Sequence, residues 1–426
     1  MDQFDLARLF RANEISATDY VSQIESYFSA REPSVLAFLP AGNRFERLCR
    51  ETEELLIRYP DSQNRPPLFG MLVGVKDIFH ADGFTTRAGS RLPLDELQGE
   101  EAESVTRLKE AGALVMGKTV TTEFAYFTPG PTRNPHNPEH TPGGSSSGSA
   151  AAIGARLCPL ALGTQTIGSV VRPAAFCGAV GVKPTYERIP REGVIPLSPS
   201  LDHVGYFTPN ISTAKLVAPS LYTDWEDATS QDKKPTLGIP EGPYLSSSSD
   251  YALACFGAIC ESLFDAGYEL RRTSVMDNFQ EIRIRHDVII SAEAAQVHAE
   301  WFEKYKELYS SKFTELVQRG RLISDLQSLL KARDTFRAEI TQTMDENNID
   351  LWICPPTIGP APKGLDSTGD PVMNLPWTQI GLPALNIPTG KSDDGLPMGL
   401  QVIGKWNADE ELLAWAEDIE KVVNQL

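Results

Sequence analysis

The sequence predicts an α/β fold, and three observations favour it. An apolar run of strand length, Leu68 to Val75, precedes a helical pattern from Glu101 to Ala111 and a second apolar run from Ala113 to Met116. This β, α, β order is typical of α/β proteins. Apolar residues make up 41% of the 426 residues and charged residues 23%, a globular composition. Further apolar runs at Pro383–Ile387 and Leu400–Ile403 predict more strands near the C-terminus.

The first 65 residues read as a helical segment. Leu6, Leu9 and Phe10 form a short apolar face. Ser16 followed by Asp19 predicts the cap of a second helix. A third helical pattern runs from 43 to 59 and ends before a proline.

Residues 66–235 alternate predicted strands, loops and helices. The strand 68–75 places Lys76 at a strand end, where α/β proteins usually build sites. A proline-rich loop, 129–142, leads to a small-residue helix over 147–157. A short strand is expected at 158–162.

Residues 236–426 begin with a strand at 237–240 and then turn helical. Trp301, Tyr305, Leu308 and Tyr309 share one helical repeat, as do Leu322, Leu326, Leu329 and Leu330. A strand follows at 350–354. Asn407 with Glu410 predicts the cap of a last amphipathic helix.

Charge and targeting signals exclude several classes of protein. A net charge of −18 opposes binding to nucleic acid or anionic lipid. No window approaches the apolar length of a membrane span, and the acidic start, Met1 to Asp5, is unlike a signal peptide. Six scattered cysteines without a C-x-x-C pair predict reduced thiols and no structural zinc. We therefore expect a cytoplasmic protein.

The chemistry is concentrated between Gly143 and Pro173. Ser145 follows two glycines, Gly143 and Gly144, which allow close backbone approach to a ligand. Ser169 ends a short polar segment in which consecutive N–H groups can point at one spot. A hydroxyl beside free N–H donors is what acyl transfer requires, and Lys76 is the strongest upstream candidate for its base.

These residues resemble the amidase signature family over nearly the whole chain. The motifs that carry the resemblance are Gly74-Val75-Lys76-Asp77, Thr141 to Gly148, Gly163 to Pro173, Gly181 to Thr185, Ser200-Leu201-Asp202, and Gly395 to Gln401. The intervals between Lys76, Ser145 and Ser169 are those of the family. The resemblance implies one large α/β domain over 1–426, with a central mixed sheet flanked by helices on both faces. In this domain, residues 66–235 would be the catalytic core, and the helical region at about 275–345 would be the variable part of the substrate pocket.

The resemblance also implies roles. Ser169 would be the acylated nucleophile, Ser145 a bridging hydroxyl after a cis peptide bond, and Lys76 the base. Lys76 must then be neutral, and Asp77 is expected to point away from it. The N–H groups of Thr166, Ile167, Gly168 and Ser169 would form the oxyanion hole. The sequence departs from the family in having Ile167 in place of a glycine and Gln165 in place of an acid.

Arg172 lies three residues after Ser169, which resembles the malonamidase-like branch. There an arginine would receive a substrate carboxylate, because guanidinium binds carboxylates bidentately. The other interpretation is a structural salt bridge. If Arg172 receives a carboxylate, the substrates would be small amides with an anionic acyl side.

Other signals compete with this interpretation. Ser146 stands in a G-x-S-x-G pattern, but no strand precedes it and no histidine follows His298. His136 and His140 have a zinc-like spacing but lie in a Pro/Asn loop, so we expect loop histidines and no metal.

We expect an amidase without a cofactor that hydrolyses a small-molecule amide through Ser169. A homodimer is left open. The alternatives are a protein similar to the catalytic subunit of a glutamine-dependent amidotransferase and a catalytically silent binding protein.

Overall fold

The computed structural model describes residues 3–228 and 233–425, so Met1 and Asp2 of the acidic start lie outside it. Its named strands form one ten-stranded sheet, ordered β2-β1-β3-β5-β4-β9-β10-β8-β6-β7. The strands are β1 (Leu72–Lys76), β2 (Leu114–Thr119), β3 (Leu160–Gln165), β4 (Val180–Lys183), β5 (His203–Thr208), β6 (Leu237–Glu241), β7 (Leu270–Ser274), β8 (Leu351–Cys354), β9 (Ala384–Lys391) and β10 (Pro397–Ile403). The helices are α1 (Gln3–Arg11), α2 (Ala17–Val35), α3 (Arg44–Arg58), α4 (Glu103–Glu110), α5 (Ser147–Gly154), α6 (Val171–Cys177), α7 (Ile211–Leu221), α8 (Asp250–Asp265), α9 (Phe279–Val297), α10 (Ala299–Tyr305), α11 (Ser311–Gly320), α12 (Leu326–Glu346), α13 (Leu375–Gln379) and α14 (Asp409–Val423).

The sheet is mixed, as the resemblance implied. β1 runs parallel to β2 and β3, and β6 runs parallel to β7 and β8. The strands between β3 and β8 pair antiparallel. The pairing of β4 with β9 joins the early and late parts of the chain in one sheet.

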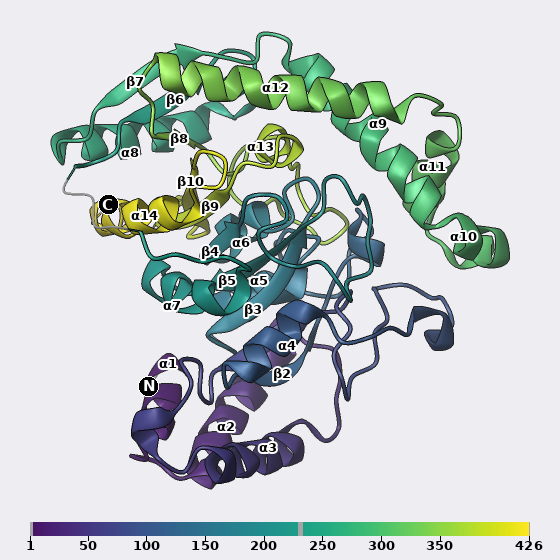
Figure 1. Ribbon diagram of the computed structural model, residues 1–426, viewed down its shortest axis with the longest axis vertical. Coiled ribbons are helices and arrows are strands. Elements are labelled where there is room, and N and C mark those ends of the chain that lie inside the picture. Colours follow the sequence, from purple (N-terminus) through teal and green to yellow (C-terminus); the bar gives the residue numbers. More distant parts are fainter. Residues whose placement is uncertain (1–2, 229–232, 426) are drawn as a thin grey trace.

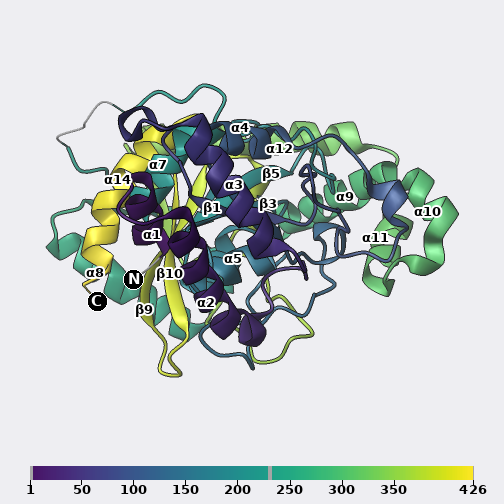
Figure 2. The same cartoon turned by 90° about the horizontal axis from the view of Figure 1, so that it is seen from below.

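Helices cover both faces of the sheet (Figures 1 and 2). Alternation along β1 sends Val73 and Val75 into a core that also contains residues of α4, α7 and α14. Leu72 faces the other way, into a core built with α1, α2, α3 and α5. This alternation also decides on which face each side chain at the end of β1 lies.

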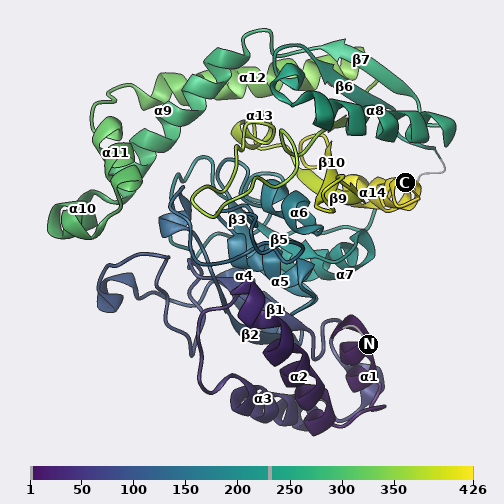
Figure 3. The same ribbon diagram turned by 180° about the vertical axis from the view of Figure 1, so that it is seen from behind.

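The segment between β7 and β8 forms a helical arm, with α9, α10 and α11 at one side of the molecule and α12 returning across the top (Figures 1 and 3). The two predicted helical repeats are interrupted in it. α10 ends at Tyr305 and a 3-10 turn covers Leu308, while Leu322 lies before α12 begins at Leu326. Polar caps set these boundaries, since Ser310 caps α11 and Asp325 caps α12.

Two predicted helix starts have different outcomes. Ser16 caps α2 by accepting a hydrogen bond of 3.0 Å from the N–H of Asp19, as predicted. The prediction for Asn407 was wrong, because α14 begins at Asp409 with Ala408 in the cap position and no side-chain cap bond. Asn407 instead has a φ of 58°, and its N–H donates to Thr185 Oγ1 at 3.1 Å.

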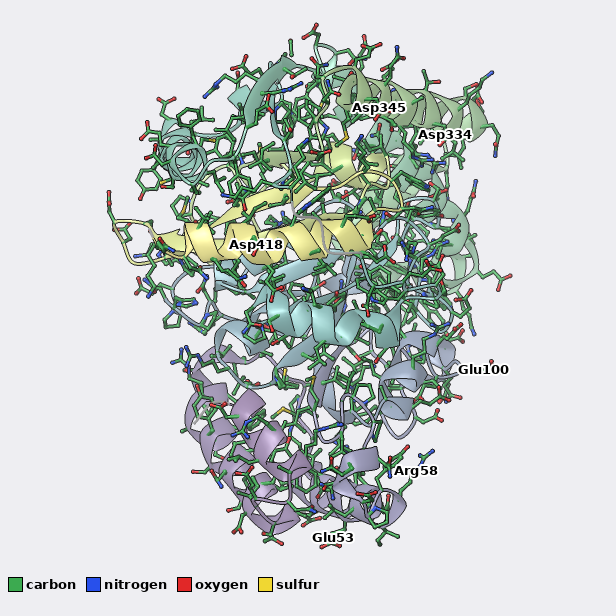
Figure 4. All side chains as sticks on the ribbon, turned by 60° about the vertical axis from the view of Figure 1, so that its left-hand side comes forward. Glu53, Arg58, Glu100, Asp334, Asp345 and Asp418 are labelled. Carbon is green, nitrogen blue, oxygen red and sulfur yellow. The ribbon has the colours of Figure 1, made fainter. Side chains whose placement is uncertain are left out.

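Acidic side chains are spread over the surface. Exposed acidic residues include Glu53 of α3, Glu100 before α4, Asp334 and Asp345 of α12, and Asp418 of α14 (Figure 4). The six cysteines are free thiols. Within residues 3–228 and 233–425, no helix has both the length and the apolar character needed to cross a membrane.

Candidate active site

Lys76 ends β1 and is fully buried. Its Nζ lies 2.8 Å from Ser145 Oγ and 2.8 Å from Thr164 Oγ1. Burial lowers the pKa of the Lys76 ammonium well below its usual value, while the carboxylate of Asp202 partly opposes this shift. The side chain is therefore suited to act as a neutral amine beside a hydroxyl.

Asp77 lies next to Lys76 but leaves the strand end on the opposite face. Its carboxylate forms an ion pair with Lys118 of β2, with Oδ1 and Nζ 3.0 Å apart and both side chains buried. Lys118 also donates to the carbonyl of Phe79 at 2.7 Å. The carboxylate of Asp77 is thus paired with Lys118 and not with Lys76, in line with the expectation that Asp77 points away from Lys76.

The loop before α5 holds Ser145. Gly143 has a φ of +81°, and a Cβ there would lie 2.8 Å from the Cα of Pro173. The Gly144–Ser145 peptide bond is cis. The hydroxyl of Ser147 donates to the carbonyl of Gly143 at 2.8 Å, and the N–H of Thr122 donates to the carbonyl of Ser145 at 3.2 Å. These bonds fix Ser145 at the start of α5, over the face of the sheet from which Lys76 projects.

Ser169 lies in the connection from β3 to α6, and Gln165 closes the base of this loop. The Oε1 of Gln165 accepts from the N–H groups of Val170 at 2.8 Å and Val171 at 3.0 Å. An amide oxygen therefore accepts the bonds that a carboxylate could accept in the same position. Although Gln165 replaces the acid that is usual in the family, both N–H groups therefore keep a hydrogen-bond acceptor.

The loop 166–169 presents its carbonyls to the protein. His286 of α9 donates to the carbonyl of Thr166 at 3.0 Å, and the hydroxyl of Thr378 in α13 donates to that of Ile167 at 2.5 Å. In the described chain, the N–H groups of Ile167, Gly168 and Ser169 have no hydrogen-bond partner. Free N–H donors beside a hydroxyl can hold an oxyanion.

Ile167 fits this loop without a left-handed backbone, because its φ is not among the positive values found. Its side chain packs against both the core of β1 and the core around Trp377. Glycine is required at the next position instead, because a Cβ on Gly168 would come within 2.3 Å of Asn374 Oδ1.

One narrow cavity brings these groups together. Ser145, Ser169, Thr166, Ile167 and Arg172 line it, together with Ala125, Tyr126, Phe127, Leu197 and Pro371. The hydroxyl of Ser169 has no hydrogen-bond partner within the described residues, so its Oγ is available to a bound molecule. A wider, open pocket adjoins the cavity through the shared residues Tyr126, Phe127 and Pro371.

Arg172 lines the same cavity and braces its wall. Its Nη2 donates to the carbonyl of Gly144 at 2.6 Å and to Thr368 Oγ1 at 3.3 Å, and its Nη1 donates to the carbonyl of Gly369. Its Nε is buried without a partner. Burial lowers the pKa of Arg172 to about 10, so the group stays charged at neutral pH. No ion pair of Arg172 occurs in the described chain, which leaves a buried cation beside the serines.

The competing signals lie elsewhere or have other partners. The hydroxyl of Ser146 donates to the carbonyl of Thr164 at 3.2 Å and does not line the cavity. His136 and His140 contact the carbonyls of Cys177 and Ala361 at 2.9 and 2.8 Å. No group of three His, Cys, Asp or Glu suited to a metal occurs in the described ranges.

Three side chains at the site had no role in the sequence interpretation. His286 and Thr378 hold the loop carbonyls, and Asp202 accepts from the hydroxyl of Thr166 at 2.6 Å. Burial raises the pKa of Asp202. Two signals were present in the sequence: Asp202 ends the motif Ser200-Leu201-Asp202, and His286 is a polar residue on an otherwise apolar helix face between Ile282 and Ile289.

The fold and the matched sequence define the class of protein. The model of the amidase family matches residues 43–413, and the chain belongs to this family. It is therefore an enzyme of the class that acts on amide C–N bonds.

Particular relatives resemble it over nearly their whole length. The A-subunit of the glutamyl-tRNA(Gln) amidotransferase of Symbiobacterium thermophilum is 32% identical, covering 96% of this chain and 95% of the relative. That of Geobacter metallireducens is 30% identical, covering 99% and 98%. A crystal structure of an amidase is 29% identical with a TM-score of 0.87, covering 99% of this chain and 100% of that one.

Proposed function

We propose that the chain is an amidohydrolase that cleaves the C–N bond of a small carboxamide through an acyl-enzyme on Ser169. The hydrogen bond between Lys76 and Ser145, in a buried setting that lowers the lysine pKa, is the observation that carries this proposal. It supplies a neutral base behind a bridging hydroxyl, Ser145, that lines the same cavity as Ser169.

In the acylation step, Ser169 Oγ attacks the amide carbon. Its proton passes to Ser145 Oγ while the proton of Ser145 passes to Lys76 Nζ. The carbonyl oxygen becomes an oxyanion, held by the free N–H groups of the loop 166–169. The tetrahedral intermediate then collapses, the C–N bond breaks, and the leaving nitrogen takes the proton back through the same two groups.

Hydrolysis of the ester completes the cycle. A water molecule gives one proton to Ser145, whose own proton passes to Lys76, and the water oxygen attacks the acyl carbon. The bond to Ser169 Oγ breaks and that oxygen regains a proton. The products are a carboxylic acid and ammonia or an amine, and no step uses a metal or an organic cofactor.

We further propose, in keeping with the malonamidase-like position of Arg172, that the substrate carries a carboxylate on its acyl side. The support is that the side chain of Arg172 lines the cavity, is charged at neutral pH and has a buried Nε without a hydrogen-bond partner. Gly143 and Gly144 would form the adjoining wall for the bound acyl group. The free thiols fit a cytoplasmic location.

A second candidate is an amidotransferase component that passes ammonia to a partner protein. The names of the amidotransferase relatives, at 30 to 32% identity over nearly full length, favour it. The departure from the family pattern at Thr166-Ile167 argues against it. A third candidate, a silent homologue that binds amides, would follow if Ile167 disabled the oxyanion hole.

A fluorophosphonate probe and an ammonia assay separate these functions. We expect the purified chain to label once, at Ser169, and to release ammonia from carboxylate-bearing amides with no partner present. Absence of labelling would favour the silent homologue. Labelling with ammonia release only after a partner protein is added would favour the amidotransferase.

A further inference from the structure

Gln165 and Thr378 form a directed hydrogen-bond chain that ends on the nucleophile loop. Two backbone N–H groups, of Val170 and Val171, point at Oε1 of Gln165, so only its NH₂ group can face Thr378. That Nε2 donates to Thr378 Oγ1 at 2.9 Å. The hydroxyl of Thr378 must then use its single proton elsewhere. Its nearest acceptor is the carbonyl of Ile167 at 2.5 Å, against 3.1 Å for the carbonyl of Asn374.

This chain fixes the direction of the N–H group of Gly168, which lies between the cavity-lining residues Ile167 and Ser169. The carbonyl of Ile167 and the N–H of Gly168 belong to one planar trans peptide and point in opposite directions. Holding the carbonyl on Thr378 therefore turns the N–H of Gly168 away from α13. Gln165 and Thr378 are both buried, at 0% and 1% exposure, so water does not replace either of them.

His286 does the same for the preceding peptide. It holds the carbonyl of Thr166 at 3.0 Å, and this peptide carries the N–H of Ile167. The two anchors come from α9 and α13, far along the chain from the loop that they hold. Neither side chain lines the cavity, so both act through the backbone.

We propose that Thr378 is a positioning residue that aims the N–H of Gly168 at the substrate oxyanion, and that Gln165 sets the direction of its hydroxyl. This inference rests on the proposed function, because it needs Ser169 as the nucleophile. A carboxylate at position 165, the usual family residue, would still accept from Val170 and Val171. It would also accept the proton of Thr378 and so take the donor away from Ile167.

Thr378→Val tests the anchor, because valine keeps the shape and loses the hydroxyl. We expect the rate constant of fluorophosphonate labelling and kcat to fall on the order of 10- to 100-fold, below the loss of a whole oxyanion donor, with KM within about 3-fold. Thr378→Ser restores the hydroxyl, and we expect it to bring both rates back to within about 3-fold of wild type. Thr52→Val is the matched control, because this buried hydroxyl in α3 also bonds helix carbonyls, at 2.8 Å, remote from the loop.

Gln165→Glu tests the direction of the hydroxyl. An ionised side chain accepts the proton of Thr378, whereas a protonated one donates to it as the amide does. We expect the labelling rate of this variant, divided by that of wild type at the same pH, to rise as pH falls through the pKa of the new side chain.

The outcomes distinguish this inference from the proposed function. Wild type that does not label overturns the proposed function. Wild type that labels, with Thr378→Val within 2-fold of it, overturns the inference alone. So does a folded Thr378→Ser that labels no faster than Thr378→Val, or a Gln165→Glu ratio that does not change with pH.

Discussion

The Nζ of Lys76 and the Oγ of Ser145 lie 2.8 Å apart in a setting from which water is excluded. The other hydrogen-bond partner of the amine, Thr164, is also a neutral hydroxyl. Because no carboxylate is in hydrogen-bond contact with it, burial dominates the pKa of this amine. The lowered pKa of Lys76 therefore leads to one prediction for the pH dependence of acylation and one for the pH dependence of stability.

The rate of acylation should follow the ionisation of Lys76. Since the pKa of Lys76 is lowered, the amine is neutral above that value and loses its basicity as pH falls through it. We expect kcat/KM to decrease on the acid side with a single ionisation, and Lys76→Met to lose on the order of 10²- to 10⁴-fold. Steady-state rates over pH 5 to about 10 check this. Lys183→Met removes another buried strand lysine and should keep the labelling rate per folded molecule.

The stability of the fold should depend on pH in the opposite sense to that expected for a lysine in an ordinary ion pair, whose pKa is raised rather than lowered. The pKa of Lys76 is lower folded than unfolded, where it is about 10.4, so the unfolded chain binds an extra proton between the two values. The free energy of unfolding of wild type should therefore rise with pH relative to Lys76→Met, by at most about 1.4 kcal/mol per pH unit. Urea unfolding of both proteins at pH 7 and pH 9 measures this. A difference that does not change with pH would mean that Lys76 is charged in the folded protein.

The three neighbouring serines should behave differently. Ser169→Ala should abolish fluorophosphonate labelling, and Ser145→Ala should slow it on the order of 10²-fold or more by interrupting the relay. Ser146→Ala should still label once per chain. Peptide mapping of the labelled protein locates the adduct, and an adduct on Ser146 would instead support the G-x-S-x-G interpretation.

Arg172 should discriminate between substrates. If it binds a carboxylate, Arg172→Met should raise KM at least about 10-fold more for carboxylate-bearing amides than for neutral ones of equal size, as expected for losing a charged hydrogen bond. KM and kcat are measured for matched substrate pairs. An equal loss for both would leave Arg172 only as the brace of Gly144 and Gly369.

The buried pair of Asp77 and Lys118 should be costly to break from one side. Asp77→Asn leaves a buried ammonium without its counter-ion, and we expect it to lower the free energy of unfolding by about 3–5 kcal/mol. The double variant Asp77→Leu with Lys118→Met removes both charges and should lose less than Asp77→Asn. Chemical denaturation of the single and double variants tests this, and a double variant less stable than Asp77→Asn would contradict it.

Local patterns were sufficient to predict the parts of the fold in which one segment decides its own structure. The apolar run before Lys76 gave the strand β1, and Ser16 with Asp19 gave a capped helix. The helical repeat around Leu322 failed, because the caps at Ser310 and Asp325 divide the apolar pattern into separate helices. The ends of these helices depend on single polar capping residues, which a search for apolar periodicity does not detect.

The candidate site was predictable only in part for the same reason. Lys76, Ser145 and Ser169 lie beside glycines or at strand ends, so their own neighbours single them out. Thr378 and His286 reach the loop only because β9 pairs with β4 and α9 packs beside α13, and no local pattern encodes either contact. Their importance appears only when the segments are assembled.

The helix that follows Ser169 rests on β9 and β10. During synthesis on the ribosome, both serines and the lysine emerge long before the strands that support this helix. Helix α6 can therefore pack into its final place only after β9 and β10 have been translated.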